Sequence, residues 1–335
     1  MSANLPQQFR NAEKQYRNCS TAVEELECLQ RMLRETPKHT GTDKLRANLK
    51  RKISQVKSAV QSPRTTGVRS GLTLPRQGAG RVVLIGGPNS GKSRLLATLT
   101  DSAPHVASFP FTTRVPLPGL MPFEDVKIQL VDTSPIIRDN YSSQTASLVR
   151  SADLVLCLAD LESEDSAEVL VDVINTVQKS RSRLANEGKL DANDIGVTYT
   201  KTFLVWTKID AVGASSRHDC FRAQLEKPLI QLNLTEFEVS AENQTGLAPL
   251  KKGIFDSLNI VRVYTKDPSK KEPDLEHPLT LTYGSEVIHL AGMVHQELAN
   301  QFHSARIWGK NKHDGTIVNS HYILQDRDVV EIKTR

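Results

Sequence analysis

The sequence predicts an α/β protein built around a doubly wound, mostly parallel sheet, with a helical hairpin before it and a small α+β domain after it. Short β-branched runs alternate with helical patterns between Arg81 and about Leu258, which is typical of a parallel sheet covered by helices on both faces. Helical periodicity fills residues 1–61, and short strand-like runs follow residue 260.

The composition of the chain is that of a globular protein of two or three domains. Of its 335 residues, 38% are hydrophobic and 24% charged. No apolar run approaches the ~20 residues that a membrane span needs. The polar N-terminus predicts no secretory signal. The four cysteines form no C-x-x-C pair, which argues against disulfides and a zinc site. We therefore expect a cytoplasmic protein, away from membranes, with Cys157 as a small buried residue.

The N-terminal region, residues 1–61, has the apolar periodicity of two helices. Thr21, with Glu24 three residues later, is a candidate N-cap for a helix that stops before Pro37. The apolar positions of that helix are Val23, Leu26, Leu29, Met32 and Leu33. Thr42 or Asp43 is the candidate cap of the second helix, whose apolar positions are Leu45, Leu49, Ile53 and Val56. Residues 62–80, rich in Pro, Gly, Ser and Arg, predict a basic linker.

The basic charge of the chain is concentrated between Gly41 and Arg81. This stretch holds ten basic residues and one acid, Asp43, so its formal charge is ten minus one, or +9, whereas the whole chain carries +5. The ten are Lys44, Arg46, Lys50, Arg51, Lys52, Lys57, Arg64, Arg69, Arg76 and Arg81. Such a stretch is the electrostatic signature of a polyanion partner. The alternative is a solvated helix face and linker, and the sequence favours neither.

A glycine-rich segment follows the first strand-like run of the central region. The run VVLIG leads into GGPNSGKS, residues 86–93, and the helix-like RLLATL comes next. In this context G-x-x-x-x-G-K-S is a phosphate-binding loop, whose backbone N–H groups cradle phosphate oxygens. Lys92 is expected to reach the β- and γ-phosphates, and Ser93 to offer its hydroxyl to Mg²⁺. The candidate nucleotide contacts here are Gly86, Pro88, Asn89, Ser90, Gly91, Lys92, Ser93 and Arg94.

A second motif, TKID, predicts which base is bound. Asp210 at its end can accept two hydrogen bonds from the guanine N1–H and exocyclic amine, whereas adenine would leave the carboxylate unpaired. Lys208 is expected along the base plane and Thr207 against the phosphate loop. A later strand ends in VSA, where the backbone N–H groups of Ser240 and Ala241 are candidates to meet the guanine carbonyl. The three motifs in this order predict a guanine nucleotide.

Two segments between these motifs are predicted to sense the nucleotide. A threonine in FPFTTRVPLPG can bind Mg²⁺ and sense the γ-phosphate; Thr112 and Thr113 both qualify, and Thr113 is favoured. The run VKIQLVD ends in Asp132, which is placed to hold the Mg²⁺ shell. The usual D-x-x-G pattern puts a glycine N–H against the γ-phosphate, but Pro135 has no N–H. Either this segment reads the nucleotide differently, or GTP and GDP are distinguished poorly.

Hydrolysis requires a positioned water and a compensating positive charge. Ile136 stands where many GTPases carry a water-positioning glutamine, so catalysis cannot use that side chain. Asn89 is a candidate to bind K⁺ beside the phosphates, where the ion would replace an arginine finger; alternatively, Asn89 merely tolerates the loop conformation. The catalytic candidates are thus Lys92, Asn89 and Thr113, and the metal-binding candidates are Ser93, Thr113 and Asp132.

These motifs together resemble the Obg–DRG branch of GTPases, the developmentally regulated GTP-binding family. GGPNSGKS, FPFTT, TKID and VSA occur in the family's order, and TPKHTGTDKLRANLKRKIS is similar to its helical region. The tail from about Val261 resembles the TGS domain, a ubiquitin-like β-grasp, with its SARIWGKNKH and HYILQDRDVVEI segments. The resemblance implies a P-loop NTPase G domain at 81–259 and a TGS domain at 260–335. The interval between Asp132 and Thr207 is too short for the domain inserted in full DRG proteins.

The resemblance implies a slow, Mg²⁺-dependent and K⁺-stimulated GTPase that works with ribosomes or other RNA through the basic stretch and the TGS domain. The basic residues around Trp308 in the TGS domain are Arg306, Lys310, Lys312 and His313. Trp308 itself is expected to pack in the small core. Two alternatives stay open: a non-hydrolysing guanine-nucleotide-binding scaffold, suggested by Pro135 and Ile136, and a TGS-mediated RNA or protein adaptor.

Overall fold

The computed structural model describes residues 6–19, 22–38, 40–61, 74–100, 116–138, 141–190, 197–225, 232–267, 272–309 and 315–334. The expected features outside these residues are Thr21, Thr112, Thr113, Arg64, Arg69, Lys310, Lys312 and His313. The chain divides into two compact units, one of residues 1–121 and 129–251, the other of residues 122–128 and 252–335. Within the described part of the chain, no helix is long and apolar enough to cross a membrane.

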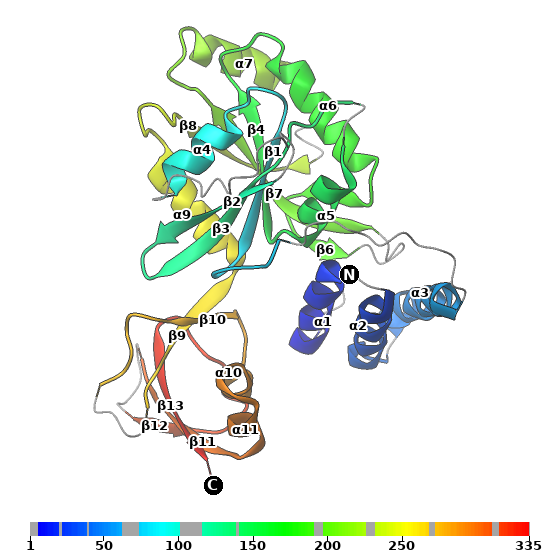
Figure 1. Ribbon diagram of the computed structural model, residues 1–335, viewed down its shortest axis with the longest axis vertical. Coiled ribbons are helices and arrows are strands. Elements are labelled where there is room, and N and C mark those ends of the chain that lie inside the picture. Colours follow the sequence, from blue (N-terminus) through cyan, green and yellow to red (C-terminus); the bar gives the residue numbers. More distant parts are fainter. Residues whose placement is uncertain are drawn as a thin grey trace, which may run out of the picture. The chain divides into compact units, whose positions relative to one another are not determined.

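Three helices form the N-terminal region: α1 (Gln7–Asn18), α2 (Ala22–Glu35) and α3 (Asp43–Gln61), with a 3₁₀ turn, η1 (Thr40–Thr42), before α3 (Figure 1). The expected pair corresponds to α2 and α3, and α1 is an addition. The shared core consists of Phe9, Ala12, Leu29, Met32, Leu45, Leu49 and Val56. The placement of Val23 in the apolar stripe is wrong, because its side chain is 55% exposed at the start of α2.

The central sheet is mostly parallel, as the alternating pattern predicts. Its strands are β1 (Arg81–Gly86), β2 (Leu117–Phe123), β3 (Val126–Asp132), β4 (Leu154–Asp160), β5 (Ser182–Ala185), β6 (Lys189–Leu190), β7 (Thr198–Thr207) and β8 (Thr235–Val239). The order is β2-β3-β1-β4-β7-β5, with β6 and β8 also pairing with β7 (Figure 1). β1 pairs in parallel with β3 and β4, and β7 in parallel with β4 and β8. The residues of β1 and β4 are all buried, because both faces of the sheet are covered.

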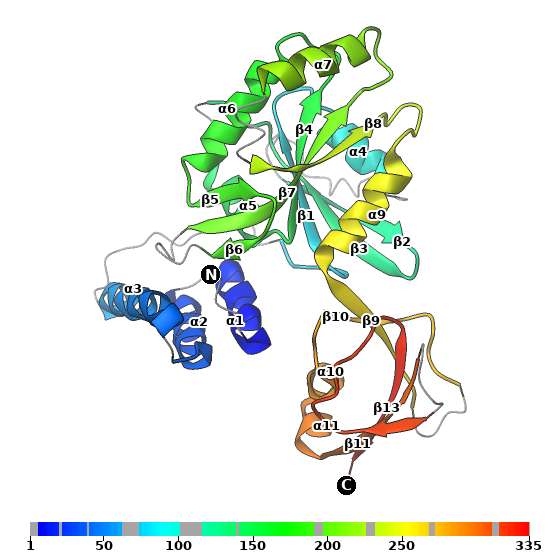
Figure 2. The same cartoon turned by 180° about the vertical axis from the view of Figure 1, so that it is seen from behind.

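Helices cover both faces of this sheet. The helices are α4 (Lys92–Leu99), α5 (Ser143–Ser151), α6 (Ser166–Gln178), α7 (Ala214–Gln224) and α9 (Leu247–Leu258). The apolar side chains of α5, α6 and α7 share one core with those of β1, β4 and β7, while α4 and α9 lie on the opposite face (Figure 2). Helix α6 ends at Gln178, and after a short turn the chain enters β5.

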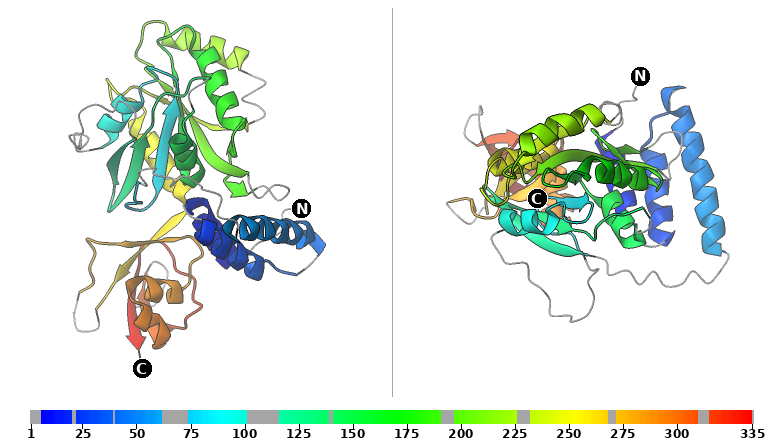
Figure 3. Two further views of the ribbon diagram at one scale, coloured as in Figure 1. Left: turned by 45° about the vertical axis from the view of Figure 1, so that its right-hand side comes forward. Right: turned by 90° about the horizontal axis from the view of Figure 1, so that it is seen from above.

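The C-terminal module is a second, five-stranded sheet. Its elements are β9 (Ile260–Thr265), β10 (Leu279–Thr282), α10 (Val287–Val294), α11 (Gln296–Asn300), β11 (Phe302–Trp308), β12 (Thr316–Val318) and β13 (Asp328–Thr334). The order is β10-β9-β13-β11-β12; β9 and β13 pair in parallel, and the other neighbours are antiparallel. The module is the orange and red part of the ribbon that ends at the C-terminus in Figure 3. Two short helices, α10 and α11, lie between β10 and β11 in the chain. Trp308 is half-buried and outside the module's core cluster, with the Lys266 ammonium 4.7 Å from its ring centroid.

The four cysteines divide into one buried residue, one close pair and one exposed residue, Cys220 on α7. Cys157 is fully buried in β4, which confirms its expected role as a small core residue. Cys19, just after α1, and Cys28 on α2 have their sulfur atoms 3.4 Å apart as free thiols. Burial raises the pKa of Cys19 to about 12, so at neutral pH this thiol is protonated and chemically quiet.

The α2 core position Leu29 has a matched surface position, Val23, on the same helix. Leu29→Ala is expected to destabilise the helical region by about 2–5 kcal/mol, because Leu29 is fully buried and its loss leaves a cavity. Val23→Ala is expected to change stability by less than about 0.5 kcal/mol. Hydrogen exchange of α1–α3 amides measures both, and equal effects of the two substitutions would contradict the assigned core.

Candidate nucleotide-binding site

The phosphate-loop segment lies between β1 and α4, as the motif requires. Asn89 and Gly91 adopt left-handed conformations, with φ of 56° and 83°. A Cβ atom added at Gly86 would lie 2.6 Å from Ser90 Oγ and 2.9 Å from the Leu158 carbonyl oxygen. The loop backbone therefore runs against β4 too closely for any side chain at Gly86, and the N-terminus of α4 is left to face a ligand.

Lys92, the first residue of α4, is folded back over this loop. Its ammonium donates to the carbonyl oxygens of Gly86 at 3.3 Å and Gly87 at 2.7 Å, and to Ser90 Oγ at 3.1 Å. The residue is 6% exposed. Burial lowers the pKa of Lys92, and the nearby Asp132 carboxylate only partly opposes this effect. A buried cation held by neutral oxygens is well prepared to gain from an anionic phosphate.

Ser93 and Asp132 come together at the end of β3. The Ser93 hydroxyl donates to Asp132 Oδ2 at 2.5 Å, while Asp132 Oδ1 is buried without a hydrogen-bond partner among the described residues. Burial raises the pKa of Asp132, against the opposing effects of Ser93 and Lys92. An unsatisfied carboxylate oxygen beside a hydroxyl is the hard-oxygen donor set that suits Mg²⁺. These two residues therefore fit the expected metal; Thr113 lies outside the described residues.

Thr207 joins the phosphate loop to the region where the base is expected. It ends β7, which pairs with β4 so that Asp160 lies opposite Thr207. Its buried hydroxyl lies 3.0 Å from the Ser90 carbonyl oxygen and 3.2 Å from that of Ala159. One hydroxyl thus contacts the loop and the end of β4, and it fixes the distance between the two halves of the site.

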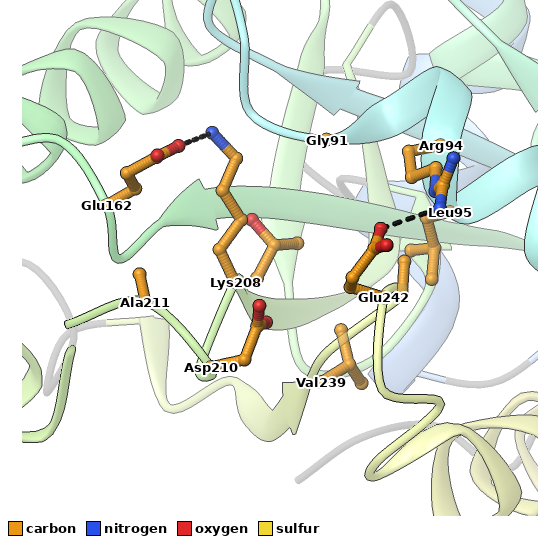
Figure 4. Close-up of a pocket in the computed structure, with 11 residues that line it drawn as sticks. Gly91, Arg94, Leu95, Glu162, Lys208, Asp210, Ala211, Val239 and Glu242 are labelled. Carbon is orange, nitrogen blue, oxygen red and sulfur yellow. Dashed lines mark hydrogen bonds and ion pairs between the residues drawn. The ribbon is translucent and has the colours of Figure 1, made fainter.

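A pocket of about 280 Å³ opens beside this contact (Figure 4). It is lined by Gly91, Arg94, Leu95, Glu162, Thr207, Lys208, Asp210, Ala211, Val239, Ala241 and Glu242. The Lys208 ammonium pairs with Asp160 at 2.9 Å and Glu162 at 2.7 Å. Burial acts to lower the pKa of Lys208, but the bonds to Glu162 and Asp160 outweigh it and raise the pKa. The lysine is thus held charged, with its aliphatic chain along the pocket.

Ser240 differs from its expected role. Its backbone N–H donates to the Thr245 carbonyl oxygen at 3.0 Å, and its hydroxyl accepts from the Asn243 N–H at 3.0 Å. Ser240 therefore shapes the turn after β8, and its backbone N–H is not available to a guanine carbonyl. The residue is also not one of those that line the pocket. Ala241, the next residue, does line the pocket and is the better placed of the two for a guanine carbonyl.

The segment after Asp132 is fixed by backbone contacts. The Thr133 hydroxyl donates to the Leu84 carbonyl oxygen at 2.7 Å, and the Ile136 N–H donates to that of Gly86 at 3.0 Å. Pro135 between them is exposed, and the Ile136 side chain is buried in the core shared with α5 and α6. The side chain at the usual glutamine position is therefore turned away from the phosphate loop.

Two acidic residues of the pocket had no signal in the sequence. Glu162, in the turn after β4, reaches Lys208, and Glu242 pairs with Arg94 at 2.6 Å across the pocket mouth (Figure 4). Glu242 and Arg94 are both largely exposed, so this pair contributes little to stability. Both carboxylates meet residues far away in the chain, and no short motif contains them.

Comparison with known proteins agrees with this geometry. Residues 81–189 match the family of 50S ribosome-binding GTPases, and residues 261–334 match the TGS domain. An uncharacterized GTP-binding protein of Methanocaldococcus jannaschii is 26% identical, covering 92% of this chain and 92% of its own. Developmentally-regulated G-protein 2 of Arabidopsis thaliana is 26% identical, over 92% of this chain and 90% of its own. Ribosome-interacting GTPase 1 of Saccharomyces cerevisiae is 25% identical, over 93% and 99%.

The chain is therefore a GTP-binding GTPase that carries a TGS domain. The relatives match over more than nine-tenths of the chain, and their names agree with the resemblance to the Obg–DRG family seen in the motifs. The alignments run over 365 to 372 positions although this chain has 335 residues, so these relatives carry segments that this chain lacks. The expected absence of an inserted domain agrees with that difference in length.

Gly86 offers a test of the phosphate loop. Gly86→Ala is expected to weaken GDP binding at least ~tenfold, because the new methyl group would push the loop away from Leu158. Gly188→Ala is the matched control, since its methyl group would meet nothing closer than 3.6 Å. Fluorescent GDP titration measures both, and unchanged GDP affinity in Gly86→Ala would contradict the assigned loop.

Asp210 offers a test of the base pocket. Asp210→Asn is expected to weaken GDP binding by about ten- to a hundredfold, because two hydrogen bonds to a charged acceptor are lost. The same variant should gain affinity for xanthosine diphosphate, whose C2 carbonyl can accept from the new amide. Competition titration with GDP and xanthosine diphosphate measures the change in relative affinity for the two nucleotides. A uniform loss of affinity for every nucleotide would indicate that Asp210 does not contact the base.

Proposed function

We propose that this protein is a slow, Mg²⁺-dependent GTPase whose nucleotide state controls its association with the ribosome or another RNA. The observation that carries the proposal is the continuity of the site. Thr207 contacts the phosphate loop at Ser90, and the pocket that begins beside it contains Asp210 and Ala241. One nucleotide can therefore reach from Lys92 to Asp210.

Each phosphate-site residue has a proposed role. Lys92 exchanges its carbonyl partners for the β- and γ-phosphates and stabilises the negative charge that develops during hydrolysis. Ser93 and Asp132, joined by Thr113, would hold Mg²⁺, which supplies charge neutralisation when bound. Asn89 would hold K⁺ beside the phosphates, in place of an arginine finger. The residue at the usual water-positioning position is Ile136, whose buried apolar side chain cannot hydrogen-bond a water molecule. Slow turnover is consistent with this.

The basic surface for RNA is narrower than the net charge of residues 41–81 suggests. Arg81 is buried and bonded to Gln129, Arg76 pairs with Asp153 at 3.2 Å, and Arg46 donates to the Thr36 carbonyl. Among the described residues of this stretch, the other exposed basic side chains lie on α3: Lys44, Lys50, Arg51 and Lys57. At 100° per residue they face away from the buried stripe of Leu45, Leu49 and Val56. We propose this α3 face as the main phosphate-binding surface.

The names of similar proteins support the ribosome as the partner of this chain. One of them is called a ribosome-interacting GTPase, and the matching family is described as ribosome-binding. We propose the ribosome, and hence the cytoplasm, for this chain as well. The TGS domain is proposed as a second contact, for RNA or for a protein.

GTP turnover with Mg²⁺, in K⁺ and then Na⁺ buffer, tests the enzymatic part. We expect faster turnover in K⁺ and at least ~100-fold slower turnover in Lys92→Ala, because an ion or an ammonium aimed at the transferred phosphoryl group is worth several kcal/mol. Lys179→Ala, which removes an exposed lysine just after α6, is the control. Tight GTP binding without turnover in either salt would favour the scaffold alternative.

Co-sedimentation with ribosomes tests the α3 surface. Changing Lys50, Arg51 and Lys57 to Gln is expected to weaken binding at least ~tenfold and to reduce the slope of log affinity against log salt by roughly two to three. A control variant changes three exposed basic residues of the G domain, Lys127, Lys179 and Arg181. Equal losses in both triple variants would leave only a non-specific charge effect and would contradict the assignment of α3.

A further inference from the structure

The turn between β2 and β3 differs from an ordinary exposed hairpin turn. It consists of Glu124 and Asp125, and Glu124 adopts a left-handed conformation with φ of 50°. Residues 122–128 belong to the same compact unit as β9 and β13, although the two strands run in the sheet of the other unit. The strands β2 and β3 thus begin or end in the first unit, whereas the turn that joins them belongs to the second unit.

Arg262 on β9 holds this turn. Its side chain is 4% exposed, and its guanidinium contacts three carboxylates. One terminal nitrogen bonds Glu124 and, at 2.7 Å, Asp125. The other bonds Asp326 at 2.6 Å, with Nε of the arginine on the second oxygen of Asp326 at 3.0 Å. The arginine therefore uses its fork on a bidentate carboxylate and on both residues of the turn.

Further contacts surround this cluster. The Tyr264 hydroxyl donates to Asp125, and Arg327 pairs with Glu124 at 2.7 Å. The Arg262 guanidinium lies 4.9 Å from the ring centroid of Phe255, and Phe255 stacks on Phe123 of β2 with the centroids 4.8 Å apart. The end of the hairpin is thus held by polar contacts at its turn and by aromatic stacking at Phe123. We call Arg262, Glu124, Asp125, Asp326 and Tyr264 the arginine clamp.

The charge balance makes the clamp depend on Arg262. The hydrogen bond to Asp326 is the largest of the effects that raise the pKa of Arg262. Burial acts to raise the pKa of Asp125, but bonds from Tyr264 and Arg262 outweigh it, and the pKa lies below its usual value. Without the arginine, three carboxylates would face one another, and among the described residues Arg327 would remain paired with Glu124. Arg262 is buried, but Glu124 and Asp326 are 48% and 39% exposed, so water would offset part of the cost of removing the arginine.

The held hairpin connects the two nucleotide-sensing segments. In the chain, β2 begins at Leu117, four residues after Thr113, and β3 ends at Asp132. In the usual pattern a glycine N–H after this aspartate also binds the γ-phosphate, and Pro135 lacks that group. Asp132 is the described residue that is expected to take part in sensing, and its position depends on β3, the strand that it ends.

We infer that Arg262 is a positioning residue of the GTPase site, acting through the β2–β3 hairpin to favour the GTP-bound arrangement. The inference rests on the proposed nucleotide switch and adds the residue that couples it to the C-terminal module. Asp132 lies at the end of β3 and is a proposed ligand of the Mg²⁺ that accompanies GTP, whose γ-phosphate GDP lacks. A hairpin whose turn is held leaves β3 less freedom to move Asp132 away from the nucleotide, so the clamp favours GTP over GDP.

Nucleotide affinities of clamp variants test this inference. The variants are Arg262→Gln, Arg262→Lys and Asp125→Asn, with Arg306→Gln as a control, because Arg306 is an exposed arginine on β11 of the same module. Titration with fluorescent GDP and a fluorescent non-hydrolysable GTP analogue, both with Mg²⁺, gives two dissociation constants for each protein. We expect the constant for the GTP analogue to rise at least ~fivefold in Arg262→Gln and Asp125→Asn. The constant for GDP should change less than about twofold.

The outcomes separate positioning from mere structure. Equal changes for both nucleotides, or no change for either, would overturn the inference, because a purely structural contact does not discriminate the γ-phosphate. If Arg262→Gln does not fold, Asp125→Asn decides, since it removes one carboxylate and keeps the arginine paired with Asp326. Arg262→Lys should behave like Arg262→Gln in weaker form, because a lysine cannot bond the turn and Asp326 together.

Hydrogen exchange of the wild-type protein provides the reciprocal test. Thermodynamic coupling is reciprocal: if the clamp strengthens binding of the GTP analogue, then binding of the analogue must stabilise the clamp. Residues 122–128 and 260–265 should exchange more slowly with the GTP analogue than with GDP, and Arg262→Gln should abolish the difference. Identical exchange in both nucleotides would overturn the inference. Failure of the wild type to bind the GTP analogue at all would remove the proposed function as well, so the two failures are distinct.

Discussion

The parallel register of β1, β3, β4 and β7 is the constraint on which the site depends. Leu84 of β1 lies opposite Asp132, Gly86 opposite Leu158, and Asp160 opposite Thr207. Because the strands are parallel, their carboxyl ends meet at one edge, and residues far apart in the chain arrive there together. A shift of one residue in any pair would turn the side chain of Asp132 or Thr207 to the other face of the sheet.

Rigid and adaptable parts of the site have different physical origins. The Thr207 contacts to the loop and to β4, and the Ile136 N–H bond to Gly86, are short and buried, and they fix the phosphate loop before any nucleotide arrives. Lys92, by contrast, is a buried cation bonded to neutral oxygens, and Asp132 has one buried carboxylate oxygen without a hydrogen-bond partner among the described residues. A nucleotide with its cation would give Lys92 an anionic partner and complete the bonding of Asp132. This unfavourable state without nucleotide is a source of binding energy.

The sequence predicted those parts of the molecule whose signal is local. β1 is a continuous apolar run after its first residue, β3 alternates apolar and polar residues over its first half, and the phosphate loop and TKID are short motifs, so these parts were found. β2 was missed because LPGLMPF contains Pro and Gly, and α1 because its apolar positions are few and widely spaced. The Arg262 bonds to Glu124 and Asp125 join positions 138 and 137 residues apart, and no pattern along a chain carries that information. The competing hydrogen bond of Ser240 likewise depends on a turn that the motif does not contain.

Selection of guanine over adenine is the property that most of the site geometry serves, and isothermal titration of the intact protein with GDP and ADP in Mg²⁺ buffer tests it most directly. Asp210 at the end of the pocket should make GDP bind at least ~100-fold more tightly than ADP, because adenine leaves the carboxylate without its donors. Equal affinity for the two nucleotides would contradict the assignment of the pocket, and with it the proposed function and the role of Arg262.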